Sequence, residues 1–171
     1  HRYRTALGTG ERTLVALAST WGKHSLYGRL PTLAGRLLAA LPADSYQVVM
    51  MLHPNVWVRH SGHEIARWSA SARAAGLILV PPESGWQAAL IAADQVISDH
   101  GSLALFAASQ DVPLLTTGPC PETVPGTPAA ELARCAALLD PDGDLRGQLD
   151  ETRARFRSGS FEHIIDRVFT D

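Results

Sequence analysis

Short apolar runs alternate along the chain with segments of helical periodicity, and this alternation limits the fold more than any other feature. The apolar runs cover residues 13–19, 46–52, 77–80, 95–98 and 112–117. Apolar residues spaced three and four apart predict helices over residues 30–41, 62–76, 85–94, 102–110, 128–139, 143–157 and 161–169. Strands that are apolar throughout are typical of a parallel sheet covered by helices on both faces. The sequence therefore predicts an α/β, Rossmann-like three-layer fold with a parallel sheet of five to six strands.

The length and net charge of the chain limit its domain organisation and the classes of partner it can bind. The chain has 171 residues, enough for one domain with a substantial core, so we expect 1–171 to form a single α/β domain with C-terminal helices from about residue 128. A formal net charge of −2 gives no basic surface for nucleic acid. No apolar run reaches the roughly 18–20 residues of a membrane span, and we expect a cytoplasmic protein. Because the chain starts at His1 rather than at Met, we also expect it to be part of a longer protein.

The familiar patterns for metals and nucleophilic hydrolysis do not fit this sequence. Cys120 and Cys135 make neither a disulfide framework nor a zinc knuckle. His60 and His63 lie three residues apart, but no third ligand follows at a diagnostic spacing. The acids of "DPDGDL" (140–145) lack the glycine and glutamate positions of a calcium loop. There is no Gly-x-Ser-x-Gly elbow, and we predict no metal site and no cofactor.

The segment "LVALASTWGKHSLYG" (14–28) resembles a triphosphate-binding loop but departs from its pattern. That loop needs a glycine five residues before the Gly-Lys pair, where this chain has Leu17, and a hydroxyl residue after the lysine, where it has His24. The segment is therefore not a P-loop. The alternatives are a phosphate-side loop of another kind and a flexible surface loop. The scattered tryptophans are interpreted as packing residues, although Trp21 belongs to this segment.

Polar and small residues follow the ends of four predicted strands, at 19–22, 53–55, 81–84 and 98–102. Because ligands of parallel sheets bind at the carboxyl ends of the strands, these residues predict one binding site. The nucleotide- or phosphate-binding candidates are Thr20, Trp21, Gly22, Asn55, Glu83, Ser84, Ser98, Asp99, His100, Gly101 and Ser102. His53 is the candidate catalytic residue, as a proton donor or phosphate ligand.

Each candidate also has a purely structural interpretation. Segment 98–102 is predicted to join a strand to a helix, where free N–H groups favour phosphate, but Asp or Ser at such a position also caps helices without any ligand. His53 could be satisfied by backbone at the end of its strand. Glu83 could bind ribose hydroxyls or cap the next helix.

Taken in order, three segments resemble a known group of proteins. They are "LASTWG" (17–22), "VVMMLHPN" (48–55) and "LILVPPESGWQAALIAADQVISDHGSLALFAASQDVPLL" (77–115). The set resembles the C-terminal, donor-binding half of GT-B glycosyltransferase-like proteins over roughly residues 12 to 118. Within that group it looks most like the CDP-glycerol glycerophosphotransferases of teichoic acid synthesis. The UDP-N-acetylglucosamine 2-epimerases carry a related arrangement.

The resemblance implies a function and roles for particular residues. Thr20 and Gly22 would lie beside the phosphates of a nucleotide-diphosphate donor, and His53 would assist departure of the leaving group. Asp99, Gly101 and Ser102 would form the diphosphate turn, although His100-Gly101 replaces the Tyr-Ser that is usual in the family. The whole enzyme would move a glycerophosphate or a sugar to an acceptor hydroxyl.

The resemblance also implies a missing half. An N-terminal acceptor domain would precede His1, so this chain would be inactive alone, and the rest of the protein could place it at the inner membrane face. Two other function classes stay open. One is a UDP-sugar 2-epimerase, and the other is a non-catalytic module that binds a nucleotide or a protein.

Overall fold

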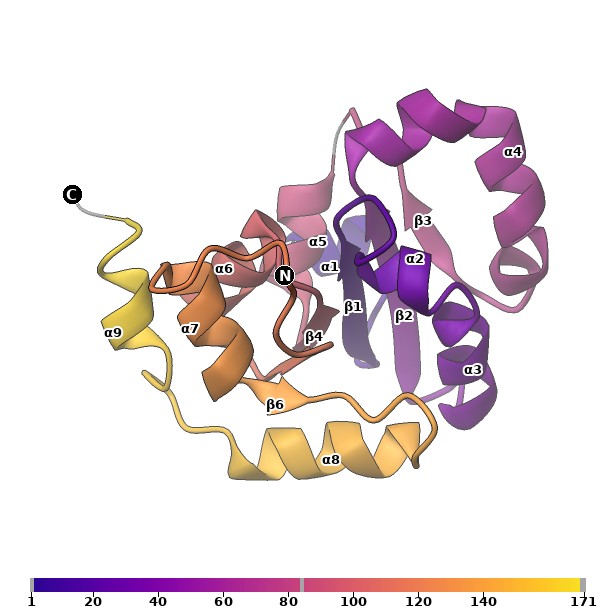
Figure 1. Cartoon of the computed structure of the whole chain (residues 1–171). Helices are drawn as coiled ribbons and strands as arrows, with labels where there is room; N and C mark the ends of the chain where they lie inside the picture. The colour runs from indigo at the N-terminus through magenta and orange to yellow at the C-terminus, as the bar shows by residue number, and fades with distance from the viewer. Residues whose placement is uncertain (1, 84, 170–171) are drawn as a thin grey trace.

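The computed structural model describes residues 2–83 and 85–169, which form three layers around one parallel sheet (Figure 1). The six strands lie in the order β3-β2-β1-β4-β5-β6. Their bounds are β1 Thr13–Ser19, β2 Tyr46–Leu52, β3 Ile78–Val80, β4 Gln95–Ser98, β5 Leu114–Thr116 and β6 Ala137–Leu138. All neighbouring pairs are parallel. The predicted fold class is confirmed, and the strand order reverses between β1 and β4.

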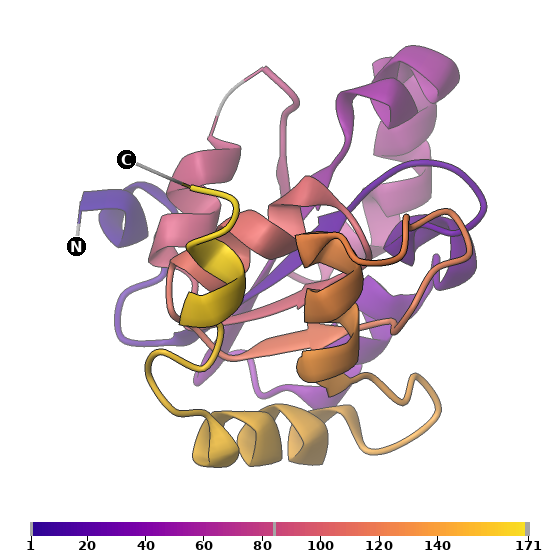
Figure 2. The ribbon, with the colours of Figure 1, turned by 60° about the vertical axis from the view of Figure 1, so that its left-hand side comes forward.

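Helices cover both faces of the sheet. Their bounds are α1 Arg2–Ala6, α2 Leu26–Arg29, α3 Leu33–Ala40, α4 Pro54–Ala74, α5 Trp86–Ala92, α6 Ser102–Ser109, α7 Pro128–Cys135, α8 Leu145–Arg155 and α9 Glu162–Ile165. The buried side chains of α2, α3, α4 and α8 belong to one apolar cluster, and those of α5, α6, α7 and α9 belong to another. On the second face, α7 and α9 lie side by side (Figure 2).

The central strand explains why the strand sequences are apolar throughout. Leu14, Ala16 and Ala18 of β1 face one helical layer, whereas Val15 and Leu17 face the other. Alternate residues of a strand point to opposite faces, so a sheet covered on both sides buries every position. No helix among the described residues is both long and apolar enough to cross a bilayer.

Several predicted boundaries are wrong. The helix predicted over 128–139 ends at Cys135, and residues 137–138 form the sixth strand, which pairs with β5. Two residues are too few to produce a recognisable alternation. The helix predicted over 30–41 is shorter, as α3 over Leu33–Ala40, and the helical turn α2 that precedes it was not predicted. The helix predicted over 161–169 ends at Ile165.

The helix predicted to start at residue 62 begins earlier, at Pro54, directly after β2. It is bent at Ser61, where φ is 57° and ψ is 151°, so α4 consists of two helical segments (Figure 1). Only Val56 of the first segment is buried. The apolar periodicity that marks a helix is therefore missing there.

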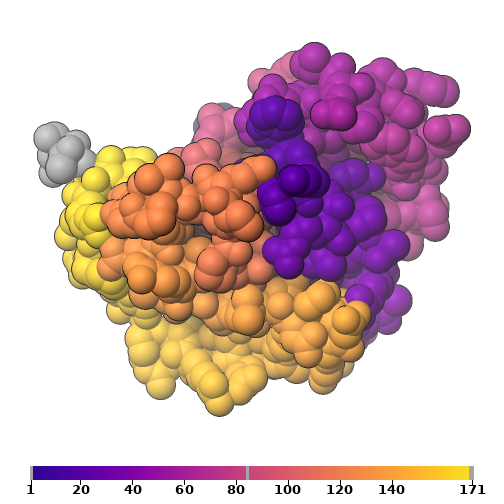
Figure 3. All heavy atoms as spheres, viewed as in Figure 1, coloured from indigo at the N-terminus to yellow at the C-terminus, as the bar shows by residue number. Residues whose placement is uncertain are grey.

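The long segment 117–127 between β5 and α7 packs against the loop that joins β1 to α2. Figure 3 shows its orange atoms against the indigo atoms of that loop. The Arg29 side chain donates a hydrogen bond from Nη1 to the Thr117 carbonyl at 3.3 Å. His24 Nε2 lies 3.9 Å from Glu122 Oε1. Both segments therefore lie at the carboxyl edge of the sheet.

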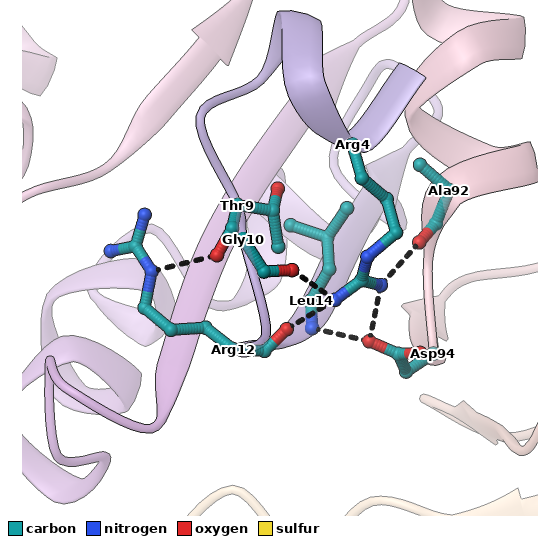
Figure 4. Close-up of polar contacts among 7 residues, drawn as sticks. All are labelled: Arg4, Thr9, Gly10, Arg12, Leu14, Ala92 and Asp94. Atoms are coloured by element: carbon teal, nitrogen blue, oxygen red, sulfur yellow. Dashed lines mark hydrogen bonds and ion pairs between the residues drawn. The ribbon is translucent and has the colours of Figure 1, made fainter. Parts of the chain in front are cut away.

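Arg4 fastens α1 to the opposite, amino edge of the sheet (Figure 4). Its Nη1 donates to Asp94 Oδ2 at 2.8 Å and to the Ala92 carbonyl at 3.2 Å. Its Nη2 donates to the carbonyls of Gly10 and Arg12. Asp94 Oδ2 also accepts the Leu14 N–H at 2.7 Å. The network ties the N-terminal segment to the starts of β1 and β4, away from the residues predicted to bind ligand.

Candidate functional site

The loop after β1 and the turn after β4 meet at the point where the strand order reverses. The chain leaves β1 toward one helical layer and β4 toward the other, and ligands of such sheets bind at this reversal point. The Asp99 carboxylate joins them. Its Oδ2 accepts the Thr20 N–H at 2.9 Å, the Thr20 hydroxyl at 2.8 Å and the Leu26 N–H at 2.7 Å. Asp99 is buried, so its carboxylate positions the loop.

Gly101 lies directly against Thr20. A Cβ atom at residue 101 would stand 2.0 Å from the Thr20 Cγ2 methyl, closer than any side chain tolerates. From the sequence, Gly101 was expected to belong to a diphosphate turn. In the structure the Thr20 methyl occupies that space, and the glycine allows the two segments to pack together.

The β1–α2 loop is fixed by close backbone contacts. Gly22 has φ of +89°, a region that favours glycine. A Cβ at Gly28 would lie 2.2 Å from the Gly22 carbonyl oxygen. The Ser25 hydroxyl donates to that oxygen at 2.8 Å and accepts the Gly28 N–H at 2.9 Å. These contacts favour a preformed loop over the flexible surface loop that the sequence left open.

The start of α6 carries free backbone donors. Gly101 is the N-cap residue and makes no side-chain capping bond, and Ser102 at the first helical position is exposed. Unpaired N–H groups and the helix dipole make such an end attractive to anions. Ser98 is different, because it is fully buried and its hydroxyl donates to the Ala18 carbonyl at 3.0 Å. Within 98–102, only the last three residues reach the surface.

His53 caps α4 with its own ring. Its Nδ1 accepts the Asn55 N–H at 3.0 Å, which leaves the proton of a neutral ring on Nε2. Leu52 pairs with Ser19, so the residues that follow them, His53 and Thr20, leave the same edge of adjacent strands. The half-buried ring can therefore hold its orientation through Nδ1 and donate through Nε2.

A cleft of about 760 Å³ lies between the β1–α2 loop and the first part of α4. It is lined by Trp21, Gly22, Lys23, Ser25, Tyr27, Gly28, Pro31, Asn55, Val56, Arg59, His60 and Trp68. The lining holds two cations, and none of its described residues is an acid. Such a surface suits an anionic ligand with an apolar or ring portion.

Aromatic rings form one wall of this cleft. Trp21 and Trp68 are 49% and 39% exposed, so neither belongs to the buried core. The Tyr27 ring stacks on Trp68 with centroids 6.4 Å apart, and the His60 ring meets Trp68 edge-on at 4.7 Å. Burial raises the pKa of the Tyr27 phenol, so it stays protonated at neutral pH.

The cleft gathers some of the predicted residues and adds others. Trp21, Gly22 and Asn55 line it as predicted members of one site. The contribution of α4 was missed, because its first segment shows no helical periodicity. Glu83 is exposed in the loop after β3, an edge strand separated from β1 by β2, and is not part of the lining. Ser84 lies outside the described residues.

A second group of side chains could hold a metal. Ligand atoms of His100, Cys120 and Glu122 all lie within 4.8 Å of one another. They come from segments far apart in the sequence, so no spacing rule could have found them. The pair considered from the sequence does not form such a group among the described residues: His60 lies 3.9 Å from Glu64, and His63 is exposed.

Comparisons with known proteins support the fold. No protein-family model and no curated protein matches the chain. Among solved structures, the glycosyltransferase WaaG of lipopolysaccharide biosynthesis is similar at 16% identity with a TM-score of 0.59, over 99% of this chain and 46% of that one. The chain therefore spans about half the length of that structure.

Two further structures extend the comparison. The C-terminal domain of the group 1 glycosyltransferase LpcC from Francisella tularensis matches at 13% identity with a TM-score of 0.57, over 100% of this chain and 94% of that one. The UDP-GlcNAc 2-epimerase from Neisseria meningitidis matches at 12% identity with a TM-score of 0.54, over 98% and 46%. The chain has the Rossmann-like fold of a GT-B C-terminal domain.

Proposed function

We propose that this chain is the donor-binding domain of a GT-B transferase and takes a nucleotide-diphosphate-linked donor at the carboxyl edge of its sheet. The observation that carries the proposal is the start of α6, where Gly101 makes no side-chain cap and donates its own N–H to Asp99, packed against the β1–α2 loop where the strand order reverses. Backbone N–H groups there suit the diphosphate. Lys23 and Arg59 of the adjacent cleft supply further positive charge.

Within this proposal the buried and surface residues have separate tasks. Asp99 and Ser98 hold the two segments in place, while Ser102 and the Gly22 loop face the phosphates. His53 donates its Nε2 proton to the phosphate oxygen that leaves. The bond between the donor group and that oxygen breaks as the acceptor oxygen bonds to the donor group. The acceptor's proton passes to a base outside this chain.

The proposal also covers which group is transferred and where the acceptor domain lies. The transferred group would be a glycerophosphate if the donor is CDP-glycerol, or a sugar if the donor is a nucleotide sugar. Either donor would present its diphosphate to this edge of the sheet. The acceptor domain is expected in another part of a longer, cytoplasmic protein, which could meet the membrane through that part. The similarity to a 2-epimerase fold favours a UDP-sugar as the second candidate ligand, with a different reaction.

The test is a calorimetric titration of the chain with CDP, UDP, GDP, CDP-glycerol and UDP-N-acetylglucosamine. The decisive variant is Ser102→Asp, which places a carboxylate at the first position of α6. An acid there is favourable for the helix but repels a phosphate. We expect saturable binding of one nucleotide class, lost in Ser102→Asp without loss of thermal stability.

Ala43→Asp is the matched control, because it adds the same charge in an exposed turn before β2, at the amino edge of the sheet. It should bind like the wild type. Equal binding by Ser102→Asp would show that α6 does not take the phosphate. Absence of binding by the folded wild type to all five compounds would overturn the donor-domain proposal for this chain.

A further inference from the structure

Three loops converge beside the start of α6. His100 follows β4, and Cys120 and Glu122 lie in the segment that follows β5. Ser98 pairs with Thr116 in adjacent parallel strands, so both segments leave the sheet at the same edge. The β1–α2 loop brings His24 to this place as well.

The distances within this group approach those of a metal site. Ligand atoms of His100, Cys120 and Glu122 lie within 4.8 Å of one another. Around a tetrahedral zinc ion with metal–ligand distances of about 2.0–2.3 Å, the ligand atoms stand roughly 3.3–3.8 Å apart. Side-chain rotations that close the group by about 1 Å would therefore reach that geometry.

Two of the three ligands have unusual surroundings. Nδ1 of His100 is buried and has no hydrogen-bond partner among the described residues. Buried polar atoms without a partner are rare in native proteins, and an unoccupied metal or water position is one explanation. The Cys120 thiol is 9% exposed and its Sγ accepts the Glu122 N–H at 3.4 Å. A thiol so enclosed is poorly placed to attack a substrate, but it can hold an ion.

His24 supplies a fourth donor. Its Nε2 lies 3.9 Å from Glu122 Oε1, and 29% of its side chain is exposed. The His24 imidazole thus lies beside the Glu122 carboxylate, which is one of the three grouped ligands. One imidazole, a thiol and a carboxylate thus surround one position, and the His24 imidazole lies next to it on the side of Glu122.

We infer that His24, His100, Cys120 and Glu122 bind a zinc ion. Nitrogen and sulfur donors suit zinc, whereas magnesium and calcium take oxygen ligands. The ion would tie the β1–α2 loop to segment 117–127 and to the turn after β4. This proposal does not rest on the proposed donor function, since none of its contacts involves a nucleotide.

The experiment is a titration of the metal-free, tag-free chain with Co²⁺ followed by absorbance, and with Zn²⁺ followed by calorimetry. We expect one ion per chain, a thiolate-to-cobalt charge-transfer band, and displacement of Co²⁺ by Zn²⁺. Cys120→Ser should lose that band. Glu122→Gln and His24→Ala should each weaken Zn²⁺ binding by at least about tenfold, as loss of supporting groups alone does in known sites.

Two matched controls lie outside the group. Cys135→Ser removes the other free thiol, which is exposed, and His63→Ala removes an exposed imidazole on α4. Both should bind as the wild type does. Glu122→Gln keeps the test independent of folding, because 57% of this side chain is exposed. A Co²⁺ complex without the thiolate band, or wild-type Zn²⁺ affinity in both Cys120→Ser and Glu122→Gln, would overturn the proposal.

Discussion

Asp99 Oδ2 accepts hydrogen bonds from both the backbone N–H and the hydroxyl of Thr20, at 2.9 and 2.8 Å. The carboxylate is buried at the end of β4, and Thr20 directly follows β1. One side chain thus sets the position of the loop after the neighbouring strand. The start of α6 and the β1–α2 loop are therefore expected to behave as one unit.

Replacement of Asp99 by Ala should destabilise the fold, because it leaves the N–H groups of Thr20 and Leu26 without an acceptor. Buried unsatisfied donors cost roughly 1–3 kcal/mol each, so the free energy of unfolding should fall by about 2–4 kcal/mol. Urea denaturation would measure it. Asp142→Ala, which removes a side chain that is 93% exposed, should change stability by less than about 0.5 kcal/mol.

The contact between Gly101 and Thr20 predicts a specific rescue. Gly101→Ala should destabilise the chain by about 1–3 kcal/mol, because its methyl would overlap that of Thr20. Thr20→Ser removes the overlapping methyl and keeps the hydroxyl that Asp99 accepts. The double variant should recover most of the loss in thermal denaturation. Additive losses in the double-mutant cycle would contradict the packing argument.

Two glycines of the same region should respond oppositely to alanine. At Gly28 a Cβ would meet the Gly22 carbonyl oxygen at 2.2 Å, and backbone cannot easily move, so Gly28→Ala should lower the melting temperature. At Gly35, inside α3, a Cβ meets nothing within 4 Å. Gly35→Ala should therefore stabilise by about 0.5–1 kcal/mol through helix propensity. Tolerance of Gly28→Ala would mean that the loop is not fixed as described.

Variants of His53 can separate its role as the cap of α4 from its proposed role as a proton donor. His53→Ala removes the acceptor for the Asn55 N–H and should cost about 1 kcal/mol of stability. His53→Asn supplies a good N-cap and should restore most of it, but it has no Nε2 proton to donate. In the proposed transferase, transfer should then stay slow in a fully stable variant. Wild-type turnover by His53→Asn would exclude proton donation by this residue.

The extent of the central strands could be predicted from the sequence. β1, β2 and β4 have the predicted bounds, because strands covered by helices on both faces are apolar over most of their length. The same reasoning gave the carboxyl edge as the place for unusual residues. It could not find β6 or the first segment of α4, since two residues or a largely exposed helix leave no apolar pattern.

The contacts within the site were decided only by the tertiary structure. The sequence predicted Asp99 and Ser98 as phosphate ligands. In the structure both are buried, and they bond to Thr20 and Ala18 respectively. The aromatic wall joins Tyr27 to Trp68, and the proposed zinc group brings His100 beside Cys120. Sequence periodicity reports which face of an element is apolar. It carries no record of which loops meet, because that depends on strand order and on the packing of whole layers.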